Sequence, residues 1–230
     1  MSIKNYYQSI SFNNEGCGYL EYGDLASARD CFRQALQFMT VAIVEAQSEN
    51  SGVELQLFDT GERHSFIQWS ALPHIPLHIP GDSFLYQRAV LINNVNKGLR
   101  VVEPTVFELS EESSMIVYNI GLSIHLMAMS SNQAKLLHEA IGFYKIAEGI
   151  RSRRVQPRMP ELLDLAIYNN MGHIEHEMVN YDQARMYFQV LREALIIFCR
   201  EGLVTFIAEQ DSNGFVLNAS MQDVTLAAAA

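Results

Sequence analysis

The fold is decided by one stretch, Phe12–Leu36, which reads FNNEGCGYLEYGDLASARDCFRQAL. Small residues at Gly16 and Ala28 are combined with large ones at helical spacings, so two helices can approach closely at the glycine. Gly23-Asp24 between them is typical of a tight turn. The stretch therefore predicts a helical hairpin with one apolar face that a neighbouring unit must cover.

The same spacing returns in the segment YNNMG at residues 168–172. Gly172 precedes Ala184 by twelve positions, as Gly16 precedes Ala28, and an aromatic residue follows each alanine after four positions. Two copies in the same phase indicate an internal repeat.

A stretched copy lies between these two. Met115–Gly121 repeats the start of the pattern, and Ala140, Tyr144 and Ala147 repeat its end. Its glycine and alanine are nineteen positions apart, seven more than in the other copies. Seven residues are about two helical turns, so both helices can lengthen without changing the face that packs.

These residues resemble the tetratricopeptide repeats, a family whose pattern spaces aromatic, glycine and alanine positions over about 34 residues. The resemblance implies a mainly α fold, a short α-solenoid of helical hairpins with a small inserted β-hairpin and loop region. We expect a single domain over 1–230, with repeats at 9–48, 111–150 (extended) and 160–200, an insertion at 49–110 and a C-terminal tail at 201–226.

The insertion differs in composition from the repeats. Val53–Phe58, Leu85–Asn93 and Val102–Leu109 are short, apolar and β-prone. We expect the second and third of these to pair through a turn at Asn94–Gly98. A helix is then expected to begin at Ser110, which acidic residues follow.

The tail also predicts a β-hairpin. Leu203–Ala208 and Phe215–Asn218 flank Asp211–Gly214, which has the composition of a turn. Asn218-Ala-Ser220 fits the N-glycosylation sequon, but no secretory signal precedes it, so we interpret the match as chance.

The repeat register implies a ligand groove, because in tetratricopeptide proteins the first helix of each hairpin lines a concave surface. Carried over position by position, the implied peptide-binding residues are Asn13, Asn14, Cys17, Leu20, Glu21, Tyr118, Asn119, Leu122, His125, Asn169, Asn170, His173, His176 and Glu177.

Three of these positions recur in every copy. Asn14, Asn119 and Asn170 each stand two positions before the repeat glycine. An asparagine side chain can bond the backbone of an extended peptide with both its donor and its acceptor. Bonding between adjacent helices is the alternative and stays open at this point.

One cluster has the spacing of a metal site. His173 and His176 share a helix face, and Glu177 is placed to be a third ligand. A polar helix surface explains the same residues, so we expect no metal and no cofactor. The sequence also has no GxGxxG, P-loop, GxSxG or HExxH motif, so we do not expect an enzyme.

Arg151, Arg153, Arg154 and Arg158 form a basic cluster in an acidic chain. Such a cluster can dock an acidic or phosphorylated partner segment. The favoured alternative is a solvated linker whose arginines complement a helix C-terminus.

Composition and charge argue against two further classes of function, nucleic-acid binding and membrane insertion. Twenty-six acidic against sixteen basic residues give a formal charge of −10, which argues against nucleic-acid binding. No stretch approaches the roughly 20 apolar residues of a membrane helix, so no membrane insertion is expected. Cys17, Cys31 and Cys199 lack CxxC spacing and predict reduced thiols inside the cell, in the cytoplasm or in an organelle if a transit peptide was removed.

We therefore expect a non-catalytic interaction module or scaffold that binds a peptide segment of a partner, in the groove or through the insertion. The main alternative is a structural or assembly subunit of a larger complex. A less favoured one is a metal-dependent hydrolase using His173, His176 and Glu177. The sequence identifies neither the partner nor whether the chain forms a homodimer.

Overall fold

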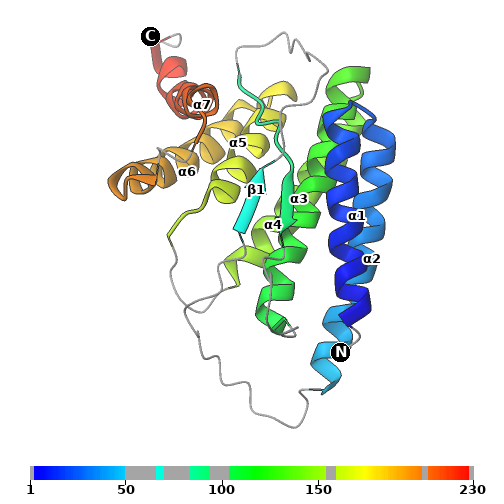
Figure 1. The fold of residues 1–230 in the computed structure, drawn as a ribbon. Coiled ribbons are helices and arrows are strands. Elements are labelled where there is room, and N and C mark those ends of the chain that lie inside the picture. The colour runs from blue at the N-terminus through cyan, green and yellow to red at the C-terminus, as the bar shows by residue number, and fades with distance from the viewer. Residues whose placement is uncertain are drawn as a thin grey trace. The chain divides into compact units, whose positions relative to one another are not determined.

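The computed structural model describes residues 3–49, 66–69, 83–93, 104–153, 159–203 and 207–227. These residues are mainly helical, which confirms the expected class (Figure 1). The elements are α1 (Ile3–Glu21), α2 (Leu25–Glu49), β1 (Phe66–Trp69), β2 (Val90–Asn93), α3 (Val106–Ser131), α4 (Ala134–Ser152), α5 (Leu162–Glu177), α6 (Tyr181–Arg200) and α7 (Glu209–Ala227).

The chain divides into two compact units. The N-terminal unit consists of Met1–Pro76 and Arg88–Ile124, and the C-terminal unit consists of Leu77–Gln87 and His125–Ala230. The first contains α1, α2, β1, β2 and most of α3, and the second contains α4 to α7.

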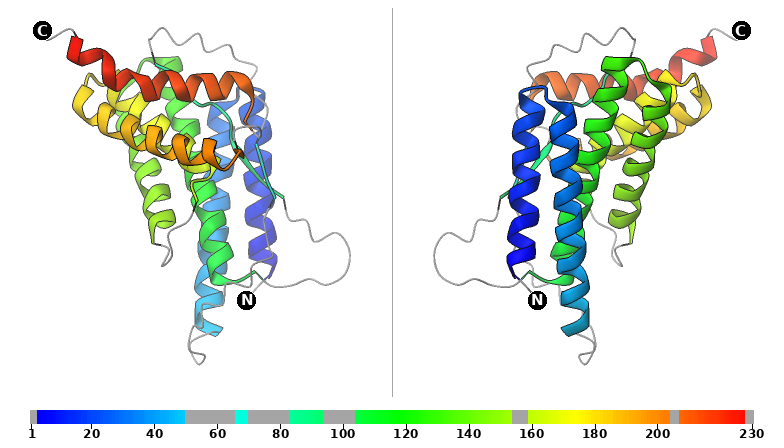
Figure 2. Two further views of the ribbon diagram at one scale, coloured as in Figure 1. Left: turned by 90° about the vertical axis from the view of Figure 1, so that its left-hand side faces the viewer. Right: turned by 90° about the vertical axis from the view of Figure 1, so that its right-hand side faces the viewer.

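In the N-terminal unit, α1 and α2 pack along their length, and α2 runs past the start of α1 (Figure 2). They approach closely at Gly16, where an added Cβ would lie 2.7 Å from the Phe32 ring. The close approach expected from the sequence is confirmed. Gly23 has φ +81° in the turn between the helices, a conformation that glycine adopts without strain.

In the C-terminal unit, α5 and α6 repeat this contact. An added Cβ on Gly172 would lie 2.3 Å from the Phe188 ring. The turn here has Val179 at φ +64°, where the first hairpin has a glycine. A β-branched residue is strained in this conformation, so packing of the two helices must hold the turn in place.

The expected pairing within the insertion is wrong. β2, the end of the predicted strand Leu85–Asn93, pairs antiparallel with β1, and Ile92 lies opposite Ile67. The predicted strand Val53–Phe58 and the predicted turn Asn94–Gly98 lie outside the described residues.

Val106–Leu109 of the predicted partner strand Val102–Leu109 is instead the start of α3, and residues 102 and 103 lie outside the described residues. A capping box explains why: the Thr105 hydroxyl accepts from the Glu108 N–H (3.2 Å), and the Glu108 carboxylate accepts from the Thr105 N–H (2.7 Å). The helix therefore begins at Val106, before the expected cap at Ser110.

The expected β-hairpin in the tail is also wrong, because Glu209–Ala227 is one helix, α7. Gly214, a turn residue in the predicted hairpin, lies inside it. An added Cβ there would be 2.3 Å from the Phe84 ring, so the glycine leaves room for an aromatic side chain. Figure 2 shows α7 lying across the α5–α6 pair.

Across the described residues, none of the helices has both the length and the apolar character needed to span a membrane.

Replacing Gly172 by alanine is expected to lower the free energy of unfolding by about 1–3 kcal/mol, because the new methyl group would overlap the Phe188 ring. The matched control is Gly142→Ala in α4, where an added Cβ meets nothing within 4 Å. The control should gain about 0.5–1 kcal/mol from higher helix propensity. Urea unfolding measures both, and equal effects would contradict the close approach of α5 and α6.

Candidate functional site

Two asparagines of the N-terminal unit hold the backbone of an extended stretch, Ser83–Asn93, which we call the inner segment. Asn14 donates to the Ile92 carbonyl (3.0 Å) and accepts from the Ile92 N–H (2.9 Å). Asn119 makes the same pair of bonds with Val90, both at 2.8 Å. Each side chain thus takes both backbone groups of one residue, as a neighbouring β-strand would.

A third asparagine braces these two. Asn13 donates to the Val90 carbonyl (2.9 Å) and to the Asn14 side chain (3.1 Å), and it accepts from Asn119 (2.9 Å). Asn13 and Asn119 have no exposed surface, so their amide groups must be satisfied within the protein. We call Asn13, Asn14 and Asn119 the N-terminal clamp.

Two further predicted groove residues contact the same stretch. The Cys17 thiol lies 3.4 Å from the Val90 carbonyl, and the Tyr118 hydroxyl donates to the Arg88 carbonyl (3.1 Å). Burial raises the pKa of the Cys17 thiol, so it stays protonated and can donate. Five of the residues predicted from α1 and α3 therefore bind extended backbone, and that backbone belongs to the chain itself: Asn13, Asn14, Cys17, Tyr118 and Asn119.

The C-terminal unit builds a second clamp in the same way. Asn170 bonds both backbone groups of Tyr86 at 3.0 Å. Asn218 accepts from the Phe84 N–H (2.8 Å) and donates to the Phe84 carbonyl (2.7 Å). Asn169 donates to the Phe84 carbonyl (3.0 Å) and to the Asn170 side chain (3.1 Å), and it accepts from Asn218 (2.8 Å). We call Asn169, Asn170 and Asn218 the C-terminal clamp.

Sequence reasoning missed Asn218, which occupies the place in this clamp that Asn119 occupies in the other. A signal was present: Ser220, a small residue, stands two positions after it, as Gly16, Gly121 and Gly172 stand after their asparagines. The expectation of a turn at Gly214 hid this match.

Two aromatic side chains of the inner segment pack against α7. Tyr86 is 1% exposed and stacks on Phe215, with ring centroids 5.1 Å apart. Phe84 meets the same ring edge-on at 5.8 Å and lies over Gly214. The C-terminal clamp therefore holds the backbone of Phe84 and Tyr86, while α7 packs against the aromatic side chains of the same two residues.

The other predicted groove residues have different surroundings. Leu20 and Leu122 are fully buried and belong to the apolar core. Glu21 and Glu177 are half-buried at the last positions of α1 and α5.

The histidines form a buried chain of polar contacts. His125 Nε2 lies 3.1 Å from His173 Nδ1, and His125 Nδ1 lies 3.4 Å from the Tyr144 hydroxyl. That hydroxyl accepts from Asn170 (3.2 Å), so the chain of contacts ends at the C-terminal clamp. His176 instead packs on Tyr181. Of the predicted pair, His173 thus faces another histidine.

Burial controls the protonation of this pair. Desolvation lowers the pKa of His125 well below its usual value, and the neighbouring His173 adds to this. Desolvation, with a contribution from His176, lowers the pKa of His173 to about 3. Both rings are therefore neutral at pH 7. Within the described part of the chain, no group of three or more histidine, cysteine or acidic residues is arranged to hold a metal.

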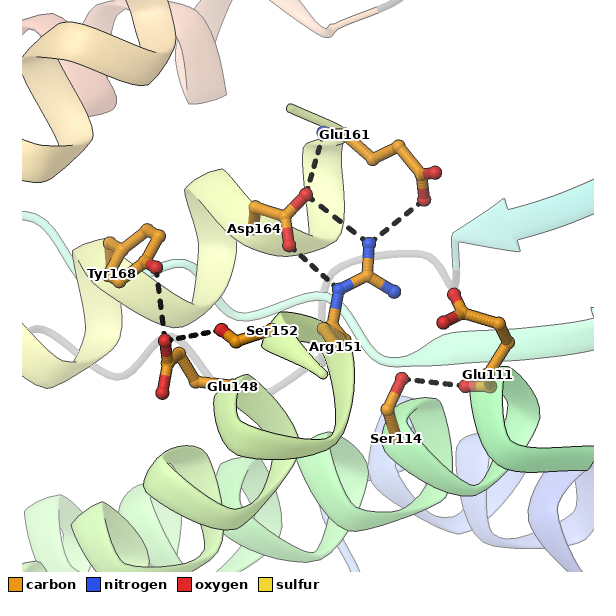
Figure 3. Close-up of polar contacts among 8 residues, drawn as sticks. All are labelled: Glu111, Ser114, Glu148, Arg151, Ser152, Glu161, Asp164 and Tyr168. Carbon is orange, nitrogen blue, oxygen red and sulfur yellow. Dashed lines mark hydrogen bonds and ion pairs between the residues drawn. The ribbon is translucent and has the colours of Figure 1, made fainter. Parts of the chain in front are cut away.

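The arginine cluster also differs from the expectation. Arg151 is 3% exposed, and its Nε lies 2.7 Å from Asp164 while Nη2 lies 3.0 Å from Glu161 (Figure 3). It joins the end of α4 to the start of α5, so Arg151 is neither free to dock an acidic partner nor part of a solvated linker, the favoured alternative. Arg153 is exposed at the C-cap of α4, and the other two arginines, Arg154 and Arg158, lie outside the described residues.

Searches for matching family models, curated proteins and solved structures returned no match to this chain.

Replacing Asn218 by leucine is expected to lower the free energy of unfolding by about 2 kcal/mol or more, because it leaves the Phe84 N–H and the side-chain Oδ1 of Asn169 unpaired. The matched control is Asn213→Leu at an exposed position of α7. Chemical denaturation compares the two, and equal stabilities would contradict the clamp.

Stability is expected to fall as the pH drops below about 6.5. The folded pKa values of His125 and His173 lie below those of the unfolded chain, so the unfolded state takes up protons first. Each histidine then contributes a slope approaching about 1.4 kcal/mol per pH unit. The contribution of the two neutral histidines to the free energy of unfolding is therefore fully present above about pH 6.5, and it is lost as the pH falls further.

The variant His173→Gln should reduce this slope between pH 6.5 and 5, as measured by urea unfolding at each pH. The exposed His138→Gln, on α4, is the matched control and should keep the slope of the unaltered chain. A slope that survives in His173→Gln unchanged would show that this histidine is not buried and neutral.

Proposed function

We propose that this chain is a non-catalytic interaction module whose two asparagine clamps bind extended peptide backbone. The observation that carries the proposal is the repeated bonding pattern: Asn14, Asn119, Asn170 and Asn218 each take the N–H and the carbonyl of one residue of the inner segment.

Backbone recognition of this kind does not depend on the side chains of the bound segment, so it suits a site that accepts partner segments. Apart from the half-buried Asn14, the clamp asparagines are buried, and bonds among the asparagines already orient both clamps. Little ordering is then needed when a peptide binds, which favours affinity. In this proposal the inner segment is a built-in ligand that occupies the clamps until a partner segment replaces it.

We also propose a tetratricopeptide-like arrangement for the helices. An asparagine followed two positions later by glycine or serine occurs in α1, α3, α5 and α7. The close approaches at Gly16 and Gly172 support the same repeat. On this view the chain is a short α-solenoid of three hairpins, and α7 is the first helix of a fourth unit that lacks its second helix.

An assembly subunit is the second candidate, because the clamps are filled by the chain itself. In that case the inner segment is a permanent part of the structure and exchanges with no other peptide. The metal-dependent hydrolase has less support, since His173 Nδ1 lies against His125.

The two candidates differ in their response to a peptide supplied in trans. The probe is a fluorescein-labelled peptide SFLYQRAVLIN, the sequence of Ser83–Asn93. The protein is the full chain carrying Phe84→Ser and Tyr86→Ser, shown by circular dichroism to be folded. We expect saturable binding by fluorescence anisotropy, and at least tenfold weaker binding to the unaltered chain, whose own segment competes at high effective concentration.

The clamp control adds Asn170→Leu and Asn218→Leu to the same chain and should weaken binding at least tenfold. Two results would favour the assembly subunit. In the first, the folded Phe84→Ser/Tyr86→Ser chain does not bind the peptide. In the second, it binds the peptide equally well with and without the two asparagines.

A further inference from the structure

The inner segment presents two aromatic side chains to one ring of α7. Phe84 and Tyr86 are two positions apart, and alternate residues of an extended backbone point to the same side. Phe215 lies between them, stacked on Tyr86 (interplanar angle 27°) and edge-on to Phe84 (89°). Both geometries are favourable for aromatic pairs.

The seat of Phe84 is shaped by a missing side chain. Gly214 is buried, and a Cβ added to it would come within 2.3 Å of the Phe84 ring. Even an alanine would therefore fill the space that the ring occupies. The helix accepts a glycine in its interior, which lowers helix propensity by about 1 kcal/mol relative to alanine.

Bonds from asparagine side chains to the backbone of the inner segment fix the register of these two rings on α7. Asn218 binds the backbone of Phe84, and Asn170 binds the backbone of Tyr86. A bound segment therefore has two backbone anchors, and each anchor coincides with one ring seat. A peptide with aromatic residues at adjacent positions cannot fill both seats in this register.

The N-terminal clamp has a different character. Its two anchored residues, Val90 and Ile92, are aliphatic, and both are buried. Selectivity for aromatic side chains is therefore a property of the C-terminal clamp alone.

We propose that the C-terminal clamp recognises an extended segment of a partner protein with aromatic residues at alternate positions, aromatic-x-aromatic. Phe84-Leu85-Tyr86 is this chain's own copy of that motif. Gly214 and Phe215 are the residues that determine specificity, while Asn169, Asn170 and Asn218 bind the backbone. This inference rests on the proposed function and adds the class of partner.

The test compares three labelled peptides on the Phe84→Ser/Tyr86→Ser chain. They are SFLYQRAVLIN, the same peptide with alanine for Phe84 and Tyr86, and a control with alanine for Gln87, a half-buried position. We expect the loss of both aromatic residues to weaken binding at least tenfold, and the Gln87 change to alter it less than threefold.

A second chain adds Gly214→Ala and probes the seat directly. It should bind SFLYQRAVLIN at least threefold more weakly, but it should bind a peptide with alanine in place of Phe84 as well as before. This non-additive pattern is specific to steric contact between the methyl group and the ring.

The outcomes separate the two proposals. Equal, asparagine-dependent binding of the aromatic and alanine peptides would overturn the aromatic motif and leave the proposed function standing. Binding of no peptide would overturn both. A third result is that Gly214→Ala weakens binding of the peptide with alanine in place of Phe84 as much as it weakens binding of SFLYQRAVLIN. That result would overturn the role of Gly214 as the seat of the Phe84 ring.

Hydrogen exchange of the unaltered chain gives a measurement that needs no substituted protein. Excess SFLYQRAVLIN should speed exchange of the chain's own Phe84 and Tyr86 amides, because displacement removes their asparagine acceptors. The alanine peptide should not do so at the same concentration. Unchanged exchange up to the solubility limit of the aromatic peptide would overturn the proposal.

Discussion

Buried backbone must be hydrogen-bonded, and this requirement organises the residues around the inner segment. Ser83–Asn93 runs extended next to helices, whose own backbone groups are already bonded within the helix. A side-chain amide can supply a donor and an acceptor together from two separate atoms. The asparagines of α1, α3, α5 and α7 do this, so they bond the inner segment from helices much as a neighbouring strand would.

The sequence was most informative where a local spacing carries the contact. Gly16 with Phe32, and Gly172 with Phe188, were predictable because each pair lies within one hairpin and depends on helical geometry alone. The recurrence of Asn14, Asn119 and Asn170 predicted a shared role, either in binding extended backbone or in bonds between adjacent helices. The sequence did not identify the bound stretch, because nothing local to an asparagine indicates which distant part of the chain it bonds.

The errors share a cause. Gly214 resembles a turn residue in sequence, yet it lies inside α7, where its missing side chain leaves space for Phe84, far away in the chain. A turn at Gly214 predicts strands in the tail, and that prediction hides the match of Asn218 to the other asparagines. Val179 shows the reverse case: a residue with poor turn propensity takes a left-handed conformation because the α5–α6 packing around it fixes the turn.

The span of the C-terminal clamp bears on how the chain is made. Phe84 and Asn218 are 134 positions apart, and translation at about 5–20 residues per second separates their synthesis by on the order of ten seconds. During that time Phe84, Leu85 and Tyr86 have left the ribosome without the helix that covers them. The nascent chain thus carries an exposed apolar strand, a natural substrate for chaperones, until α7 emerges.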